Sequence, residues 1–169
     1  MRVDVTYNIS DLRVLAKKYP ETVRRETEAV MDLIVRRLEG EVVKRTPAGV
    51  GGAAGLKGSI HGEVMAYGSS VTGTVGTPLE YGEVVEKGRR PGKAMPPVTP
   101  IALWVQRKLG VSADEARGVG FAIARKISIE GFEGAHMFEK AWKANERWVT
   151  QQLQGLPERI VKRLDRGIS

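Results

Sequence analysis

Two histidines, His61 and His136, are the first residues to weigh for chemistry, because imidazole serves as a metal ligand and as a general base near neutral pH. Neither has a histidine, cysteine or aspartate at the spacing that a metal site needs. The chain contains no cysteine, which excludes thiolate ligands, thiol nucleophiles and disulfide bonds. We therefore expect both histidines to be surface or capping groups, and we expect no metal ion.

Three glutamates, Glu80, Glu83 and Glu86, follow one another at intervals of three residues on a short predicted helix. Such carboxylates can act as an acid and base pair or bind a divalent ion, but a solvated or subunit-facing acidic edge is the favoured interpretation. Ser59 follows a glycine yet lacks the Gly-x-Ser-x-Gly frame of an activated serine. We expect Ser59 to be a strand-entry residue, and we expect no enzymatic activity and no cofactor.

Basic pairs can contact phosphate groups, and three stand out: Arg24-Arg25, Arg36-Arg37 and Arg89-Arg90. The pair at 89–90 is the best candidate, since it is flanked by glycine and proline in a loop, and loops project from the surface. Solvation or ion pairing with another subunit is nevertheless its favoured role. The Gly-rich segment 46–55 lacks the Gly-Lys-Ser or Gly-Lys-Thr ending of a phosphate-binding loop, so we expect no bound nucleotide.

The bulk properties favour one domain. With 169 residues and 41% hydrophobic side chains, the chain can bury a single core. Its net charge of +7 is spread along the whole sequence, which argues against a dedicated DNA-reading surface. No apolar stretch approaches the roughly 20 residues that span a bilayer, and the first ten residues alternate in polarity, so we expect a protein made in the cytoplasm.

Alternation of apolar and polar residues over 1–9 predicts a half-buried strand. A short helix over 10–18 follows, for which Ser10 is a suitable cap, and Pro20 can begin a second helix. This second helix is predicted to run to Arg45 as one long amphipathic element. Its inward positions recur at intervals of three and four residues: Val23, Thr27, Val30, Ile34, Leu38 and Val42.

The segment 46–55 contains Pro47 and four glycines, so the helix cannot continue through it. Two interpretations remain open: a slack connector, and a mobile loop that orders against a neighbouring subunit. Over 60–77, apolar residues alternate on either side of a turn at 67–70, which predicts a β-hairpin. Because two strands alone are marginal in water, we expect the strand at 1–9 to join this hairpin.

The apolar residues Tyr81, Val84 and Val85 have the spacing of a short helix. We expect these three side chains to pack against the sheet. Glu83 and Glu86 would then face outward.

The C-terminal half is predicted to be helical. A helix over 99–109 comes first, and the capping box of Ser112 and Glu115 opens the next. A helical extension occupies 136–169, interrupted by Pro157. The inward face of the middle helix is expected to carry Ala116, Val119, Ala122, Ile123 and Ile127.

The predicted fold class is therefore α+β, in one domain over 1–169. A small antiparallel sheet, made of the N-terminal strand and the hairpin, packs against the long N-terminal helix. Additional helices form the C-terminal half.

The order of motifs between Gly55 and Met95 carries a resemblance to a known family. Gly-Leu-Lys-Gly-Ser-Ile precedes the hairpin, and Tyr-Gly-Glu-Val-Val-Glu-Lys-Gly and then Met-Pro-Pro follow it. A later stretch, Gly-Ala-His-Met-Phe-Glu-Lys-Ala at 134–141, looks like the entry to that family's last helix. In this order the chain resembles the neck and tail-completion (minor tail component) proteins of long-tailed bacteriophages, typified by the tenth gene product of a lambdoid HK phage.

The resemblance implies a structural virion protein of the head-tail junction, made in the host cytoplasm, that joins the tail to the head. It implies a homo-oligomeric ring, a hexamer or else a dodecamer, with a channel through which genomic DNA passes without sequence-specific binding. The neighbouring partners would be head-closure or connector proteins and tail terminator or tail tube proteins, and no membrane.

In such a protein the sheet edge and the turn over 81–88 would pack on neighbouring subunits, and mobile loops would contact the adjoining rings. The residues expected there are Tyr81, Glu83, Glu86, Arg89, Arg90, Gly51 and Gly52. The alternative is a non-specific basic nucleic-acid-binding module, motivated by 27 basic residues. For that alternative the sequence offers no helix-turn-helix pattern, no zinc framework and no exposed aromatic residues on strands.

Overall fold

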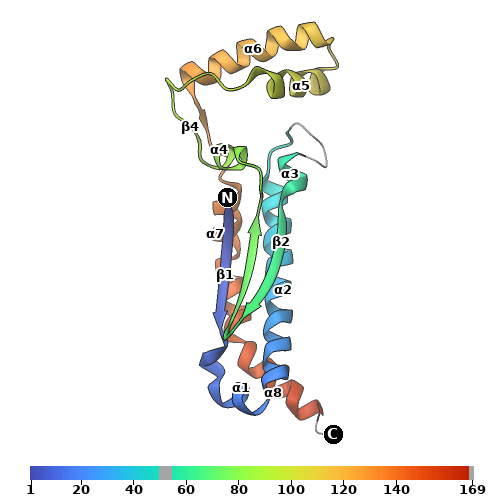
Figure 1. The fold of residues 1–169 in the computed structure, drawn as a ribbon, viewed down its shortest axis with the longest axis vertical. Coiled ribbons are helices and arrows are strands. Elements are labelled where there is room, and N and C mark those ends of the chain that lie inside the picture. Colours follow the sequence, from blue (N-terminus) through green and yellow to red (C-terminus); the bar gives the residue numbers. More distant parts are fainter. Residues whose placement is uncertain (50–54, 168–169) are drawn as a thin grey trace. The chain divides into compact units, whose positions relative to one another are not determined.

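Helices and small antiparallel sheets make up the fold, in the computed structural model shown in Figure 1. The structure describes residues 1–49 and 55–167. The predicted α+β class with a long N-terminal helix is confirmed.

The chain divides into two compact units, and each is built from several stretches of sequence. The sheet unit comprises Arg2–Lys44, His61–Gly76 and the chain from Phe138 onward. The second unit comprises Met1, Arg45–Ile60 and Thr77–Met137. We call it the hairpin unit after its helical hairpin within 98–130; the β-hairpin belongs to the sheet unit. That the two units belong to one domain stays a prediction.

Three strands form the sheet of the sheet unit, in the order β1-β3-β2. They are β1 (Arg2–Asn8), β2 (His61–Tyr67) and β3 (Ser70–Gly76). Both neighbours pair with β3 in antiparallel register, which aligns Val5 with Gly73 and Met65 with Thr72. The predicted hairpin is confirmed, and so is the addition of the N-terminal strand to it.

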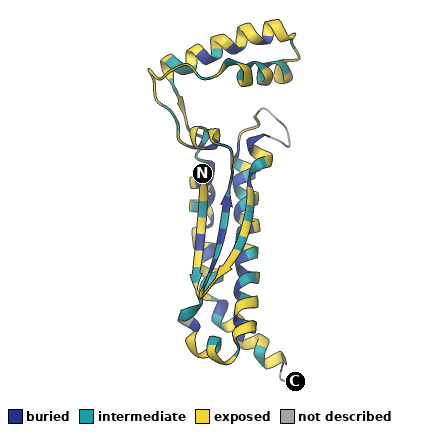
Figure 2. Ribbon diagram, viewed as in Figure 1, coloured by how far each residue is buried: buried dark blue, intermediate teal, exposed yellow. Residues whose placement is uncertain are grey.

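The long helix α2 (Pro20–Arg45) has the predicted bounds and buries all six predicted inward residues, with Met31 and Val35 in addition. Helix α2 approaches the sheet closely because β3 and β2 each present a glycine to it. A β-carbon built on Gly73 would lie 2.4 Å from Val35, and one on Gly62 only 2.2 Å from the same side chain. Figure 2 shows the buried positions along β3 and α2.

Further helices complete the sheet unit. They are α1 (Arg13–Lys18) after a 3-10 turn at Ile9–Leu12, α7 (Met137–Gln154) and α8 (Leu156–Gly167). Asn8, and not the predicted Ser10, caps the first turn, by accepting a hydrogen bond from the Ser10 amide. Helices α2 and α7 are joined by Arg37, whose Nε donates to the buried Asn145 at 2.7 Å. The Arg37 guanidinium also stacks 4.4 Å from the Trp148 ring centroid.

The hairpin unit consists of short elements and one pair of helices. The short elements are α3 (Leu56–Ser59), α4 (Tyr81–Lys87), β4 (Gly88–Arg89) and β5 (Phe132–Glu133), with β4 and β5 paired antiparallel. The paired helices are α5 (Val98–Leu109) and α6 (Ala113–Glu130). Gly110 ends α5 in the left-handed conformation, and the predicted Ser112–Glu115 capping box is present.

The predicted inward face of α6 is partly wrong. Val119 is 40% exposed and Ala122 is exposed, whereas Ala116, Gly120 and Ala124 are buried. The reason is that α6 meets α5 along its small residues: a β-carbon on Gly120 would lie 2.9 Å from the Ala102 backbone. The buried face of α6 is therefore the one whose small residues let the α5 backbone come close, and not the one with the largest apolar side chains.

Candidate assembly surfaces

Helix α4 holds three of the residues predicted to make subunit contacts, and it does so in a different orientation from the predicted one. Tyr81 is 47% exposed and Val84 is also exposed, so neither is the buried anchor that its apolar character suggested. Glu83 faces solvent, as expected, and its carboxylate lies 2.6 Å from the Lys87 ammonium. The hydrogen bond and the positive charge of Lys87 lower the pKa of Glu83 below its usual value.

The expectation that Glu86 faces outward is wrong, since only 1% of this residue is exposed. Gly82 and Glu86, four residues apart, form the buried stripe of α4. The backbone around Glu86 is held by a distant segment: Ala135 donates to the Val85 carbonyl at 2.8 Å, and His136 donates to the Glu86 carbonyl at 3.1 Å. Glu86 is thus part of the interior of the hairpin unit.

The basic pair at 89–90 divides into one inward and one outward residue. Arg89 pairs with Phe132 in the β4–β5 ladder, and its guanidinium donates to the Ala94 carbonyl, which ties the proline-rich segment back to β4. Arg90 is exposed and available to a partner. Gly51 and Gly52, the two glycines predicted to make ring contacts, lie outside the described residues.

The residues weighed for chemistry are divided between the two units. His61 begins β2 in the sheet unit, whereas His136 precedes α7 in the hairpin unit. The Ser59 hydroxyl bonds to the Leu56 carbonyl and to the Thr77 hydroxyl, at 2.9 and 2.7 Å, which are contacts within the hairpin unit. Over residues 1–49 and 55–167, no three His, Cys, Asp or Glu side chains are grouped so that they could hold a metal ion.

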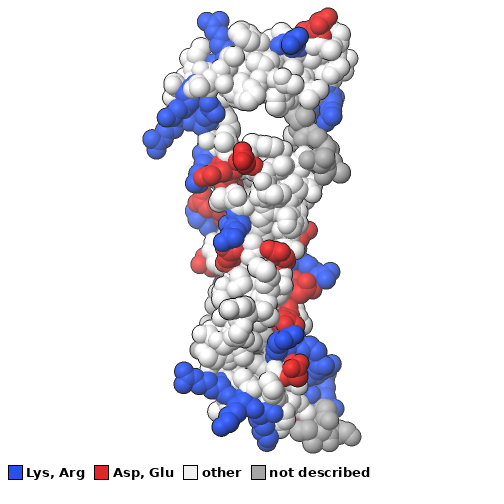
Figure 3. All heavy atoms as spheres, viewed as in Figure 1, with Lys and Arg blue, Asp and Glu red and all other residues white. Residues whose placement is uncertain are grey.

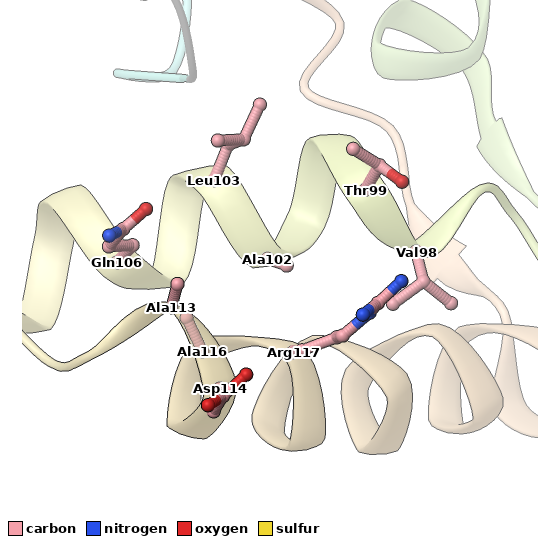
Figure 4. A pocket seen from close by; sticks show the side chains of 9 residues that line it. All are labelled: Val98, Thr99, Ala102, Leu103, Gln106, Ala113, Asp114, Ala116 and Arg117. Carbon is pink, nitrogen blue, oxygen red and sulfur yellow. The ribbon is translucent and has the colours of Figure 1, made fainter.

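A shallow groove of about 310 Å³ lies between α5 and α6, and Figure 4 shows the side chains that line it. Alanines 102 and 116 come from the two facing helices, while Asp114 and Arg117 supply one charge of each sign from α6. The lining contains no histidine and no second carboxylate to serve as a general base beside Thr99. This arrangement suits the packing of another side chain better than it suits catalysis.

One face of the three-stranded sheet is open. Helix α2 packs against the face that carries Val71, Gly73 and Val75, and the other face presents mostly uncharged side chains. We call this second surface the open sheet face, which includes the uncharged residues Thr6, Met65, Tyr67, Thr72 and Thr74 and the charged residues Arg2, Asp4 and Glu63. Cross-strand hydrogen bonds order its threonines, as between the Thr6 and Thr72 hydroxyls at 3.0 Å.

Strand β2 is an edge strand, because it pairs only with β3 within the described chain. The Gly62 amide donates to the Glu39 carboxylate of α2 at 2.8 Å, so this amide points away from β3. The alternation of an antiparallel strand directs the amides of Val64 and Ala66 to the same outer side. Met65 and Tyr67 on this strand are 57% and 91% exposed. The sequence predicted a sheet edge as a contact surface for neighbouring subunits. The structure adds that β2 forms one edge and that Met65 and Tyr67 are exposed on it.

Comparison with family models, with curated proteins and with solved structures finds no match to this chain. The resemblance to phage neck and tail-completion proteins therefore stays a prediction. No helix in the described part of the chain combines the length and the apolar character needed to cross a membrane.

Proposed function

We propose that this chain is a structural subunit of a phage head-tail junction, which assembles into a ring through strand β2. The observation that carries the proposal is the unprotected edge of β2. It is complemented by the succession of motifs from Gly55 to Met95, which resembles that of the neck and tail-completion family. Catalysis is not required for such a role.

Edge strands are normally protected against pairing with other chains by lysine, proline, bulges or covering segments. Over its seven residues β2 carries one charged side chain, the exposed Glu63, and no proline, lysine or arginine, and its register with β3 is continuous. The Glu39 carboxylate binds the outward amide of Gly62. The outward amides of the residues that follow in β2 can pair with a partner strand. Pairing with a second copy would satisfy the outer amides of Val64 and Ala66 and cover Met65 and Tyr67.

Helices α5 and α6 offer a second surface for assembly. Each exposes large apolar residues although the two helices are packed together: Leu103, Leu109, Val119, Phe121 and Ile129. Exposed apolar residues in such numbers are typical of surfaces that bind other proteins. In the proposed ring, one of the adjoining head-closure or tail proteins covers these residues, and Tyr81 and Arg90 belong to the same set of contacts.

A ring built on the β2 edge uses a heterologous contact, in which β2 of one copy meets a different surface of the next. Such contacts close into a ring when the rotation between copies divides a full turn evenly. A hexamer or a dodecamer would leave a central channel for DNA, which the subunits would not read in a sequence-specific way.

The test is the mass and symmetry of the purified protein, by light scattering and electron microscopy, for wild type and three variants. Met65→Lys puts a charge on the β2 edge, and Ala66→Pro removes an outward amide that β3 does not need. Leu33→Lys makes the same kind of change at an exposed site on α2 and is the matched control.

We expect rings from wild type and from the Leu33 variant, and dissociated subunits from the two β2 variants, with melting temperatures nearly unchanged. In a phage that encodes this chain, the β2 variants should give separate heads and tails. A protein that stays monomeric at every concentration and retains DNA in a salt-dependent way would instead favour the nucleic-acid-binding module.

A further inference from the structure

Helix α8 has two chemically distinct faces. Leu156 and Ile160 are completely buried and anchor the helix in the sheet unit. Beside this buried face lie four basic residues, which we call the basic stripe: Arg159, Lys162, Arg163 and Arg166. The side opposite Leu156 and Ile160 carries the acidic residues Glu158 and Asp165. Their spacing of three, four and seven residues from the first places all four on one face over two turns. A helix anchored on one side holds such a stripe in a fixed position.

The surroundings of the basic stripe add positive charge. Arg163 lies 3.6 Å from Glu26, which brings α8 to the first turns of α2. Helix α1 ends just before α2 begins and contributes Arg13, Lys17 and Lys18. Figure 3 shows Lys and Arg side chains gathered over this end of the sheet unit.

Much of this charge is not neutralised within the chain. Elsewhere on α2 basic residues pair with acids one turn away, as Arg36 does with Asp32 at 2.7 Å. In the stripe, by contrast, Lys162 and Arg166 are exposed and form no ion pair with any residue that the structure describes. Exposed cations without an acidic partner attract a polyanion.

From this geometry we infer that the basic stripe of α8, flanked by α1, binds the phosphate backbone of double-stranded DNA without reading its sequence. Four cations within two helical turns can neutralise neighbouring phosphates on one side of a duplex. The stripe has no asparagine, glutamine or aromatic residue with which to read base edges or to stack on single-stranded bases.

An anionic membrane surface is the other polyanion that a basic amphipathic helix can bind. That mode needs the apolar face of the helix to enter the lipid. In α8 this face is already used, since Leu156 and Ile160 are buried in the protein. The structure therefore favours DNA over lipid.

The test measures the affinity of the full chain for a short fluorescent DNA duplex of random sequence as a function of salt. Four phosphate contacts correspond to a slope of about −3.6 in log K against log salt, or a loss of roughly 100-fold between about 50 and 200 mM salt. The stripe variant is Arg159→Gln, Lys162→Gln, Arg163→Gln and Arg166→Gln. Its matched control carries the same charge change on α5 and α6: Arg107→Gln, Lys108→Gln, Arg125→Gln and Lys126→Gln.

We expect the stripe variant to lose more than tenfold in affinity and most of the salt slope, while the control keeps both within twofold. Lys162→Gln with Arg166→Gln, which leaves the Arg159–Gln152 and Arg163–Glu26 contacts intact, should lower the slope by about 1.8. Circular dichroism and melting temperature identify any variant that is misfolded.

Equal losses in the stripe variant and the control would overturn the inference, because they would show a net-charge effect. No DNA binding by wild type at low salt would also overturn it, as would binding to vesicles of anionic lipid but not to duplex DNA. The inference does not depend on ring formation: a monomer that binds DNA through α8 would refute the proposed ring and leave the stripe in place.

Discussion

The sheet unit and the hairpin unit are held together in different ways. In the sheet unit, large side chains from α2 and α7 are completely buried, among them Met31, Ile34 and Phe138. In the α5–α6 pair of the hairpin unit, the fully buried apolar residues are small: Val105, Ala116 and Ala124. Burial of apolar surface contributes to the free energy of folding in proportion to the area buried. The large buried side chains therefore stabilise the sheet unit much more than the small ones stabilise the helix pair. A helix pair of this kind gains stability when a partner covers its exposed apolar residues.

The largest effect should come from removing the biggest buried side chain of the sheet unit. Phe138→Ala deletes a ring that has no solvent exposure, and we expect it to lower the free energy of unfolding by about 4 kcal/mol. Urea denaturation followed by circular dichroism measures this loss. Phe121→Ala, at an exposed ring of α6, is the control and should change the stability of the isolated chain little.

Gly73→Val should separate α2 from the sheet. Its β-carbon alone would lie 2.4 Å from Val35 and 2.9 Å from Met31, so the helix must move, at a cost of about 3 kcal/mol. Gly40→Ala is informative beside it: nothing lies within 4 Å of the added β-carbon near the C-terminal end of α2, and the helix should gain about 1 kcal/mol. A gain in stability from both variants would refute the close approach of α2 to β3.

Gly120→Val tests whether the α5–α6 pair can lose stability without affecting the sheet unit. The added side chain would collide with the Ala102 backbone, and we expect a local loss of about 2 kcal/mol. Hydrogen exchange should accelerate in α5 and α6 while the amides of β3 and α2 stay protected. Uniform acceleration along the whole chain would show that the two units unfold together.

The smallest effect concerns the capping box of α6. The Ser112 hydroxyl and amide donate to the Glu115 carboxylate at 2.7 and 3.0 Å, and these bonds lower the pKa of Glu115 below its usual value. A lowered pKa in the folded state gives stability above the usual glutamate pKa, and this stability is lost as pH falls through the lowered value. Ser112→Ala should cost α6 about 1 kcal/mol at neutral pH. The protection of the α6 amides against hydrogen exchange should depend less on pH in the acid range in this variant than in wild type. An unchanged pH dependence of this protection would contradict the assignment.

Local signals predicted most of the secondary structure. Pro20 begins α2, and the helix ends just ahead of Thr46 and Pro47, so both bounds could be read from the sequence. The capping box and the β-hairpin are equally local. These features depend on residues within a few positions of one another, which is the range over which a pattern in one sequence is informative.

Features set by distant contacts were not predictable in the same way. Glu86 was assigned to the outside because a charged residue beside Val84 and Val85 normally faces solvent, but the segment at 135–136 holds its backbone inside. The buried face of α6 was missed because glycine carries no hydrophobic signal, although Gly120 is where α5 comes closest. Similarly, the positive charge is spread evenly along the sequence but not in space, because the fold places α1 and α8 at the same end of the sheet unit. A sheet edge was predicted as a contact surface, but which amides of β2 point outward follows only from the contact between the Gly62 amide and Glu39.

Amide hydrogen exchange at Val64 and Ala66 tests the central claim most directly, because assembly through β2 must give these outward amides a partner. The dilute subunit and the purified assembly are compared residue by residue, with the β3 amides as an internal reference for the stability of the sheet. We predict rapid exchange at both positions in the subunit and strong protection in the assembly. Rapid exchange at Val64 and Ala66 in an assembled ring would contradict pairing through β2.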